Sequence, residues 1–368
     1  MTARKAITHI ARIALVAGVT LALIGVAQAA NIDSTNKYAW GTNAGWINFN
    51  PSDGGGVTVY SDHLEGYAWG ENVGWIRLGT TTGGSPHTYA NDAANTYGVN
   101  NDGVGGLSGY AWGTNVGWIN FNPTHDQVTI DPTTGDFDGY AWGENVGWIH
   151  FQNASPAYKV NTTWRGDLTG TYQNNVAAII KDRATSPASS AGLIIANSTF
   201  LNDSGDGIIV GHNNAAFAVV TDNMGSSAGD KRWARIWQLD VNDGSGTPGG
   251  NVTLTFDISD AGGNAGNPFS GTSYFLFKRA TGSSADFTDV TVVDTSVSGD
   301  RLTFTVDASD LGSEFTVGAS SGSPTAIELL GLSARSAGAA IGLALPLALV
   351  LVGVGGLALV WRRRRAAE

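Results

Sequence analysis

The chain has 368 residues, 51 of them glycine, and only 14% of its residues are charged. Its formal net charge is −11, although seven of its 20 basic residues lie at the two ends, so the body is strongly acidic and unsuited to binding nucleic acid through phosphates. The absence of cysteine excludes disulfides and thiolate chemistry.

Residues 1–30 have the pattern of a signal peptide. Three basic residues fall within the first 12 positions, residues 13–26 form a short apolar run, and Ala27-Gln28-Ala29 is a cleavage site of the A-x-A type. A retained N-terminal anchor is the alternative, but the apolar run is short and ends in small residues. The sequence therefore predicts an exported protein.

Residues 31–172 contain four copies of the motif YAWGxNxGWI. The copies begin at Tyr38, Tyr67, Tyr110 and Tyr140, which are 29, 43 and 30 residues apart, a spacing typical of repeat architectures. The copies contain eight of the 12 tryptophans, which are Trp40, Trp46, Trp69, Trp75, Trp112, Trp118, Trp142 and Trp148.

Each copy is expected to form a β-hairpin with a five-residue turn. That turn places Trp40 opposite Trp46 on one face, with Ala39 and Ile47 on the other. The recurring turn asparagine (residues 43, 72, 115 and 145) is expected to accept a left-handed φ. A third strand should follow in each unit, and residues 168–172 resemble the start of a degenerate fifth unit. The four units could form a propeller-like, sandwich or solenoid array.

Residues 173–190 are interpreted as a connection whose apolar run at 176–180 could already join the next domain. Residues 191–320 are predicted to form a β-sandwich, because segments such as Val252–Phe256 and Leu302–Val306 alternate apolar and polar residues. The fold class is therefore all-β: an aromatic hairpin-repeat domain and a β-sandwich domain, flanked by a signal peptide and a C-terminal transmembrane helix.

Two stretches rich in Asp and Gly within this second domain resemble calcium loops, because calcium prefers several oxygens at close spacing. Neither completes an EF-hand, and ordinary turn chemistry is the alternative. No other cofactor is expected. The candidate calcium ligands are Asp203, Asp206, Asp240, Asn242 and Asp243.

The C-terminal region has three parts. Residues 321–338 form a short stalk, Ala339–Trp361 is an uncharged run of 23 residues, and Arg362–Arg365 follows. The run is long enough to span a membrane as a helix, and the arginines predict that the C-terminus stays in the cytoplasm.

Three resemblances accompany these patterns. The repeats resemble YAWGENxGWI repeats of exported bacterial proteins. The segments Lys231–Trp237, Val252–Asp260 and Phe315–Gly318 resemble a β-sandwich module of adhesin-like bacterial surface proteins. The tail resembles sorting signals cut by exosortase- or rhombosortase-type enzymes, although it lacks the Pro-Glu-Pro motif. Together they imply a protein anchored at the cell envelope, with a sorting protease as a possible partner.

Three functions are compatible with the sequence. The first is a structural or adhesive surface protein, with the tryptophans in the repeat core. The second is a carbohydrate-binding module in which exposed Trp and Tyr faces bind polysaccharide. The third and weakest is a polysaccharide-active enzyme, which is not expected because no zincin, triad or phosphate-binding motif is present, and Glu71 and Glu144 recur as turn residues. Burial of large aromatics favours the tryptophans as core, and their exposure would separate the first two functions.

Overall fold

The computed structural model describes residues 30–320 except 185, 216–217, 226, 247, 258 and 260–272. The signal peptide before residue 30, the stalk, the apolar run at 339–361 and the arginine cluster lie outside the described residues. Within them the protein is all-β, and its only helices are two short 3-10 turns, η1 (Gly170–Tyr172) and η2 (Ala308–Asp310). No helix in this part of the chain is long and apolar enough to cross a membrane.

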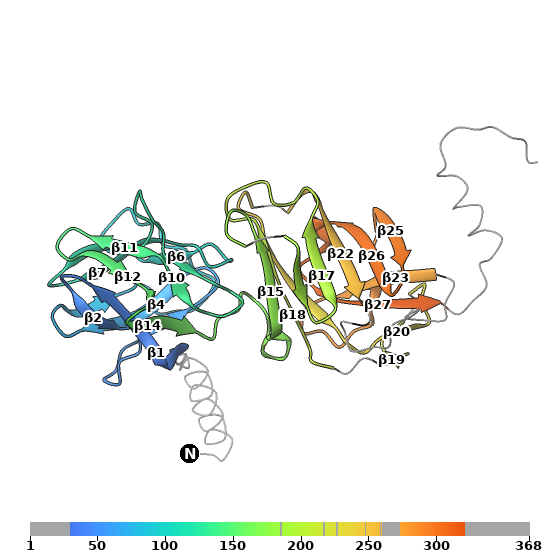
Figure 1. Cartoon of the computed structure of the whole chain (residues 1–368), viewed down its shortest axis with the longest axis horizontal. Helices are drawn as coiled ribbons and strands as arrows, with labels where there is room; N and C mark the ends of the chain where they lie inside the picture. The colour runs from blue at the N-terminus through green and yellow to red at the C-terminus, as the bar shows by residue number, and fades with distance from the viewer. Residues whose placement is uncertain are drawn as a thin grey trace, which may run out of the picture. The chain divides into compact units, whose positions relative to one another are not determined.

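The four repeats form four hairpins that close into an eight-stranded antiparallel barrel (Figure 1). The last strand pairs with the first through Trp40 opposite His150, so the ring has no free edge. This closed barrel replaces the propeller-like, sandwich and solenoid arrays expected from the sequence. The hairpins are β1 (Ile32–Gly41) with β2 (Gly45–Asn48), β4 (Leu64–Gly70) with β5 (Gly74–Arg77), β7 (Leu107–Gly113) with β8 (Gly117–Asn120), and β11 (Tyr140–Gly143) with β12 (Gly147–His150).

The register within each hairpin follows from the repeat. Trp40 pairs with Trp46 and Ala39 with Ile47, which confirms the register and the two faces predicted from the sequence. In the third hairpin Val116 donates its amide to Gly113 (3.1 Å), and Gly117 then has a φ of 73°. Because Gly113 pairs with Gly117, the loop has three residues and not the five expected, and it ends at a glycine in the left-handed region, as is common in three-residue hairpin loops.

The turn asparagines do not have positive φ among the described residues, so that expectation was wrong. Asn72, Asn115 and Asn145 link neighbouring hairpins instead. Asn115 Nδ2 donates to the carbonyl of Val73 (3.2 Å), and Asn145 Nδ2 donates to the carbonyl of Val116 (3.1 Å). Each of these turns is thereby tied to the turn of the preceding hairpin.

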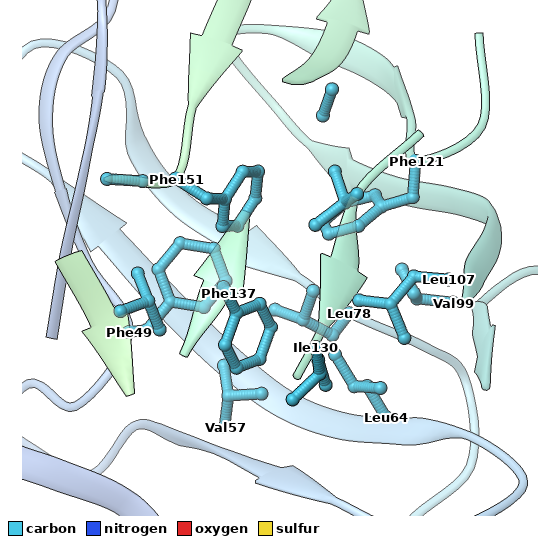
Figure 2. Packing of buried hydrophobic residues seen from close by; sticks show 14 of the residues in the cluster. Phe49, Val57, Leu64, Leu78, Val99, Leu107, Phe121, Ile130, Phe137 and Phe151 are labelled. Atoms are coloured by element: carbon cyan, nitrogen blue, oxygen red, sulfur yellow. The ribbon is translucent and has the colours of Figure 1, made fainter. Parts of the chain in front are cut away.

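The barrel interior is filled by small and medium side chains. Each hairpin contributes an alanine and an isoleucine that are almost fully buried, such as Ala111 and Ile119. The next inward position in the repeats, Phe49, Leu78, Phe121 and Phe151, packs with Phe137 and the neighbouring aliphatic residues (Figure 2). The free space that remains among these residues is about 10 Å³, hardly enough for one water. Around these described side chains the barrel interior is therefore a packed core.

Shorter strands extend the hairpins beyond the barrel. β3 (Gly56–Val59) pairs with β4, β6 (Val99–Asn101) with β7, and β14 (Ala157–Thr162) with β1 and β13 (Gln152–Ala154). β9 (Thr129–Ile130) pairs with β10 (Phe137–Asp138). Third strands therefore occur as predicted, but the supposed fifth unit is the 3-10 turn η1 rather than a hairpin.

The rest of the described chain forms two antiparallel sheets whose inner faces share one core, with side chains such as Phe256 and Phe304 from one sheet and Trp237 and Phe315 from the other. The apolar run at 176–180 belongs to the first of these sheets, as anticipated. One sheet contains β15 (Asn174–Ile180), β18 (Gly207–His212), β21 (Trp237–Asn242), β27 (Glu314–Ser320), β20 (Lys231–Trp233), β19 (Val219–Val220), β23 (Ser273–Arg279) and β24 (Thr288–Asp289). The other contains β16 (Ala188–Ser190), β17 (Leu193–Asn197), β22 (Asn251–Asp257), β26 (Arg301–Asp307) and β25 (Asp294–Ser298).

Candidate ligand-binding grooves on the barrel wall

All eight repeat tryptophans lie on the outer face of the barrel and are 37–45% exposed. The interpretation of these rings as the repeat core is therefore wrong. The reason is volume: the interior of an eight-stranded barrel is just wide enough for side chains to fill, and here alanine and isoleucine fill it. The bulky face of each hairpin must consequently turn toward solvent.

The outward positions form regular aromatic rows. Within the fourth hairpin the rings of Trp142 and Trp148 meet edge to face with centroids 4.8 Å apart, and Trp69 and Trp75 repeat this contact at 4.9 Å. At every junction between hairpins, a variable outward residue pairs with the first tryptophan of the next hairpin. These four pairs are Asn48 with Trp69, Arg77 with Trp112, Asn120 with Trp142, and His150 with Trp40.

Groove one lies over the junction of β8 and β11 and has a volume of about 670 Å³. Its aromatic lining comes from Tyr110, Trp118 and Trp142, and a loop at Asn91–Tyr97 forms a wall. Tyr97 packs edge to face on Trp118 with centroids 4.9 Å apart. The polar lining contains amides and carboxylates: Asn91, Asn120, Asn145, Asp92 and Glu144.

The wall of groove one comes from the long spacing between the second and third repeats. Its loop is internally bonded: Asn91 has a φ of 55° and accepts the amide of Gly98 (3.1 Å), while Thr96 Oγ1 donates to Asp92 (2.6 Å). These bonds stabilise the loop in the conformation that forms the wall. The 43-residue spacing was the signal in the sequence that could have identified it.

A buried cluster anchors the same insertion to β4. His63 is fully buried, with Nδ1 2.6 Å from Asp62 Oδ1 and Nε2 3.0 Å from Glu65 Oε1. Asp62 also accepts the amide of His87 (2.7 Å), and Glu65 accepts the amide of Gly84 (2.8 Å). Both carboxylates thereby hold the insertion. Although burial opposes it, the hydrogen bonds from His63 and the insertion lower the pKa of Asp62.

Groove two lies over the junction of β12 and β1 and has a volume of about 430 Å³. Trp40, Trp46, Tyr140 and Trp148 line it, and the β13–β14 hairpin forms its wall through Asn153, Pro156 and Tyr158. The Tyr158 ring meets Trp46 edge to face with centroids 5.2 Å apart. Thr42 completes the polar edge.

His150 is the central polar residue of groove two. Its ring stacks on Tyr140 with centroids 4.0 Å apart, and its Nδ1 lies 3.2 Å from the hydroxyl of Tyr158. Burial lowers the pKa of His150, although Asp138 and Asp126 raise it. A neutral ring at pH 7 can both donate and accept a hydrogen bond.

Five of the eight predicted tryptophans are therefore brought together in the two grooves: Trp118 and Trp142 in groove one, and Trp40, Trp46 and Trp148 in groove two. Trp69, Trp75 and Trp112 lie elsewhere on the outer face. The walls and the polar residues of the two grooves were not predicted from the sequence. For His150 and Asn120 the signal was their variability at one position of an otherwise regular repeat.

The candidate calcium ligands have partners within the protein. Asp206 is buried and accepts the amides of Asn202, Asp203 and Gly244, while Asp243 accepts the amides of Ser245 and Gly246. Burial raises the pKa of Asp240 to about 6, against a hydrogen bond from the amide of Asp167. Within the described residues no three acidic or histidine side chains form a group that could hold a metal. Calcium binding stays a prediction.

No protein-family model, no curated protein and no solved structure matches this chain.

Proposed function

We propose that this chain is a polysaccharide-binding adhesive protein of the bacterial cell envelope, with its ligand bound in grooves one and two. The observation that carries the proposal is the outward position of the repeat tryptophans, each 37–45% exposed on a barrel whose interior is already filled. A purely structural protein gains no core packing from rings in water, and exposed apolar patches of this kind mark binding surfaces.

The chemistry of the grooves fits a sugar. The apolar face of a pyranose ring stacks on a flat aromatic ring, and its hydroxyls need donors and acceptors at the edges. Groove one offers both, with Trp118 and Trp142 beside Asn120 and Asn145. Groove two offers Trp40 and Trp148 beside His150.

The terminal segments support display outside the cell. The signal peptide predicts export, and the apolar run at 339–361 followed by four arginines predicts an anchor with the barrel on the outer side. A β-sandwich next to the anchor would carry the barrel away from the membrane. A sorting enzyme that cuts the tail belongs to the same proposal.

The test is retention of the purified full-length chain on an array of neutral, amino-bearing and acidic polysaccharides, with calcium and with a chelator. We expect retention on at least one polymer and a loss of about tenfold or more in affinity for Trp142→Ala, since 1.4 kcal/mol of lost stacking has that effect. Trp112→Ala is the matched control, because Trp112 is equally exposed but lines neither groove.

Retention on no polymer, or an equal loss for both variants, would refute the proposal. Groove one also holds Asp92 and Glu144 in one cleft, which is the pattern that would favour an enzyme. Both carboxylates are exposed, whereas a general acid at neutral pH needs burial. Release of new reducing ends from a bound polymer, abolished by Glu144→Gln, would show catalysis instead.

A further inference from the structure

The two grooves share one hairpin. Trp142 and Glu144 of the β11–β12 hairpin face groove one, while Trp148 and His150 of the same hairpin face groove two. The rings of Trp142, which lines groove one, and Trp148, which lines groove two, are in edge-to-face contact with centroids 4.8 Å apart, so the two grooves adjoin this aromatic pair.

The spacing of the grooves fits a polymer. Groove one lies over the junction of β8 with β11 and groove two over that of β12 with β1, so they are two strand spacings apart, roughly 10 Å along the wall. The register also repeats, because Asn120 pairs with Trp142 as His150 pairs with Trp40. Equivalent contacts at a fixed interval suit a ligand that itself repeats.

The charge of the grooves restricts the polymer. Among the described residues that line them there is no lysine or arginine, and groove one carries Asp92 and Glu144. A uronate or sulfate would meet like charge without a cation to pair with, whereas a neutral sugar or a protonated amino sugar would not.

We propose that grooves one and two form one extended site that binds an internal segment of a neutral or amino-bearing polysaccharide across the β11–β12 hairpin. This inference rests on the proposed function and specifies its ligand class. A polysaccharide that occupies both grooves binds with higher affinity, because binding in the second groove is intramolecular once the first is occupied.

Calorimetry on the full chain tests this with oligomers of β-1,4-glucan, chitosan and polygalacturonate, from dimers to octamers. In the glucan or chitosan series we expect affinity to rise on the order of 100-fold between the shortest and longest oligomers, as linked sites allow. Polygalacturonate should bind weakly at every length. A flat length dependence, no binding by either expected series, or strongest binding by polygalacturonate would overturn the inference.

Variants separate a shared site from two independent ones. Trp118→Ala in groove one and Trp46→Ala in groove two should each reduce octamer affinity to that of a short oligomer, while Trp112→Ala should keep the length dependence. His150→Asn is a milder groove-two variant, because asparagine occupies this position in the first and third repeats. If the octamer keeps its gain in all groove variants, the extended site is wrong, whereas the proposed function fails if no array polymer binds or if Trp142→Ala and Trp112→Ala lose affinity equally.

Discussion

Trp118 and Ile119 are adjacent in β8, but their side chains face opposite sides of the barrel wall. Replacing each by alanine tests which residues face the interior. Ile119 points inward and is 2% exposed, while Trp118 points outward and is 45% exposed. Truncating a buried isoleucine costs about 2–5 kcal/mol, and the filled interior around Ile119 places Ile119→Ala near 4 kcal/mol.

Although it removes more atoms, Trp118→Ala should destabilise the protein less than Ile119→Ala. A buried tryptophan would cost about 3–5 kcal/mol, but nearly half of the Trp118 side chain is already in water. Its ring contacts are the edge-to-face pairs with Tyr97 and Tyr110, each worth about 1 kcal/mol. Trp118→Ala should therefore cost about 2 kcal/mol in all, less than Ile119→Ala.

The assay is equilibrium urea unfolding of the full chain, followed by far-UV circular dichroism and tryptophan emission. Eight of the 12 tryptophans lie in the barrel, so the emission change identifies the barrel transition. Ile119→Val serves as the graded control and should cost about 1 kcal/mol. A greater loss for Trp118→Ala than for Ile119→Ala would show that the ring is buried and that the outward assignment is wrong.

Four further variants test the hydrogen bonds between hairpins and the titrating groups. Asn115→Ala should lower the free energy of unfolding in urea by about 1 kcal/mol, because the hydrogen bond to Val73 is lost, and Asn115→Gly should lower it at least as much. If Asn115→Gly leaves the free energy of unfolding unchanged, the interpretation of Asn115 as a left-handed turn residue is correct after all. Burial lowers the pKa of His212 to about 4 in the folded protein, so the protein should lose stability as the pH falls from about 6.5 toward 4. In thermal melts, His212→Gln should lose less stability than the parent over this pH range. The pKa of Asp62 is lowered, so its ionised carboxylate stabilises the fold at neutral pH and this stabilisation is lost in acid. Asp62→Asn should therefore lower the melting temperature at pH 7, and its difference from the parent should shrink below about pH 4. An equal difference at both pH values would mean that the charge of Asp62 does not matter.

The hairpins could be predicted from the sequence because their determinants are local. Strict alternation and the Gly-x-Asn-x-Gly turn fix Trp40 opposite Trp46 and put Ala39 on the other face. The closure of the ring could not be predicted in this way. It depends on pairing β12 with β1 across more than 100 residues, which no local pattern specifies.

Which face of each hairpin points inward could also be predicted only if the closure of the barrel were known. Both faces of each hairpin are apolar, so hydrophobicity alone does not decide between Trp46 and Ile47. Once eight strands close, the interior admits alanine, isoleucine and one ring of larger side chains, and the indoles are excluded by size. The preference for buried tryptophan failed because it used the average behaviour of the residue and not the volume of this particular core.

The repeat forms the barrel, and the segments between and after the repeats form the walls of the two grooves. Each hairpin offers the same outward tryptophans, yet groove one takes its wall from the long insertion between the second and third repeats, and groove two takes its wall from the β13–β14 hairpin after the fourth. The barrel tolerates such additions because the inward alanine and isoleucine positions stay unchanged, so no addition disturbs the core. Asp62 and Glu65 accept the amides of His87 and Gly84, and these bonds tie the insertion to the start of β4. If the grooves bind polysaccharide as proposed, their specificity can change at the walls and at the variable outward residues, such as His150, because these positions lie outside the core of the closed ring.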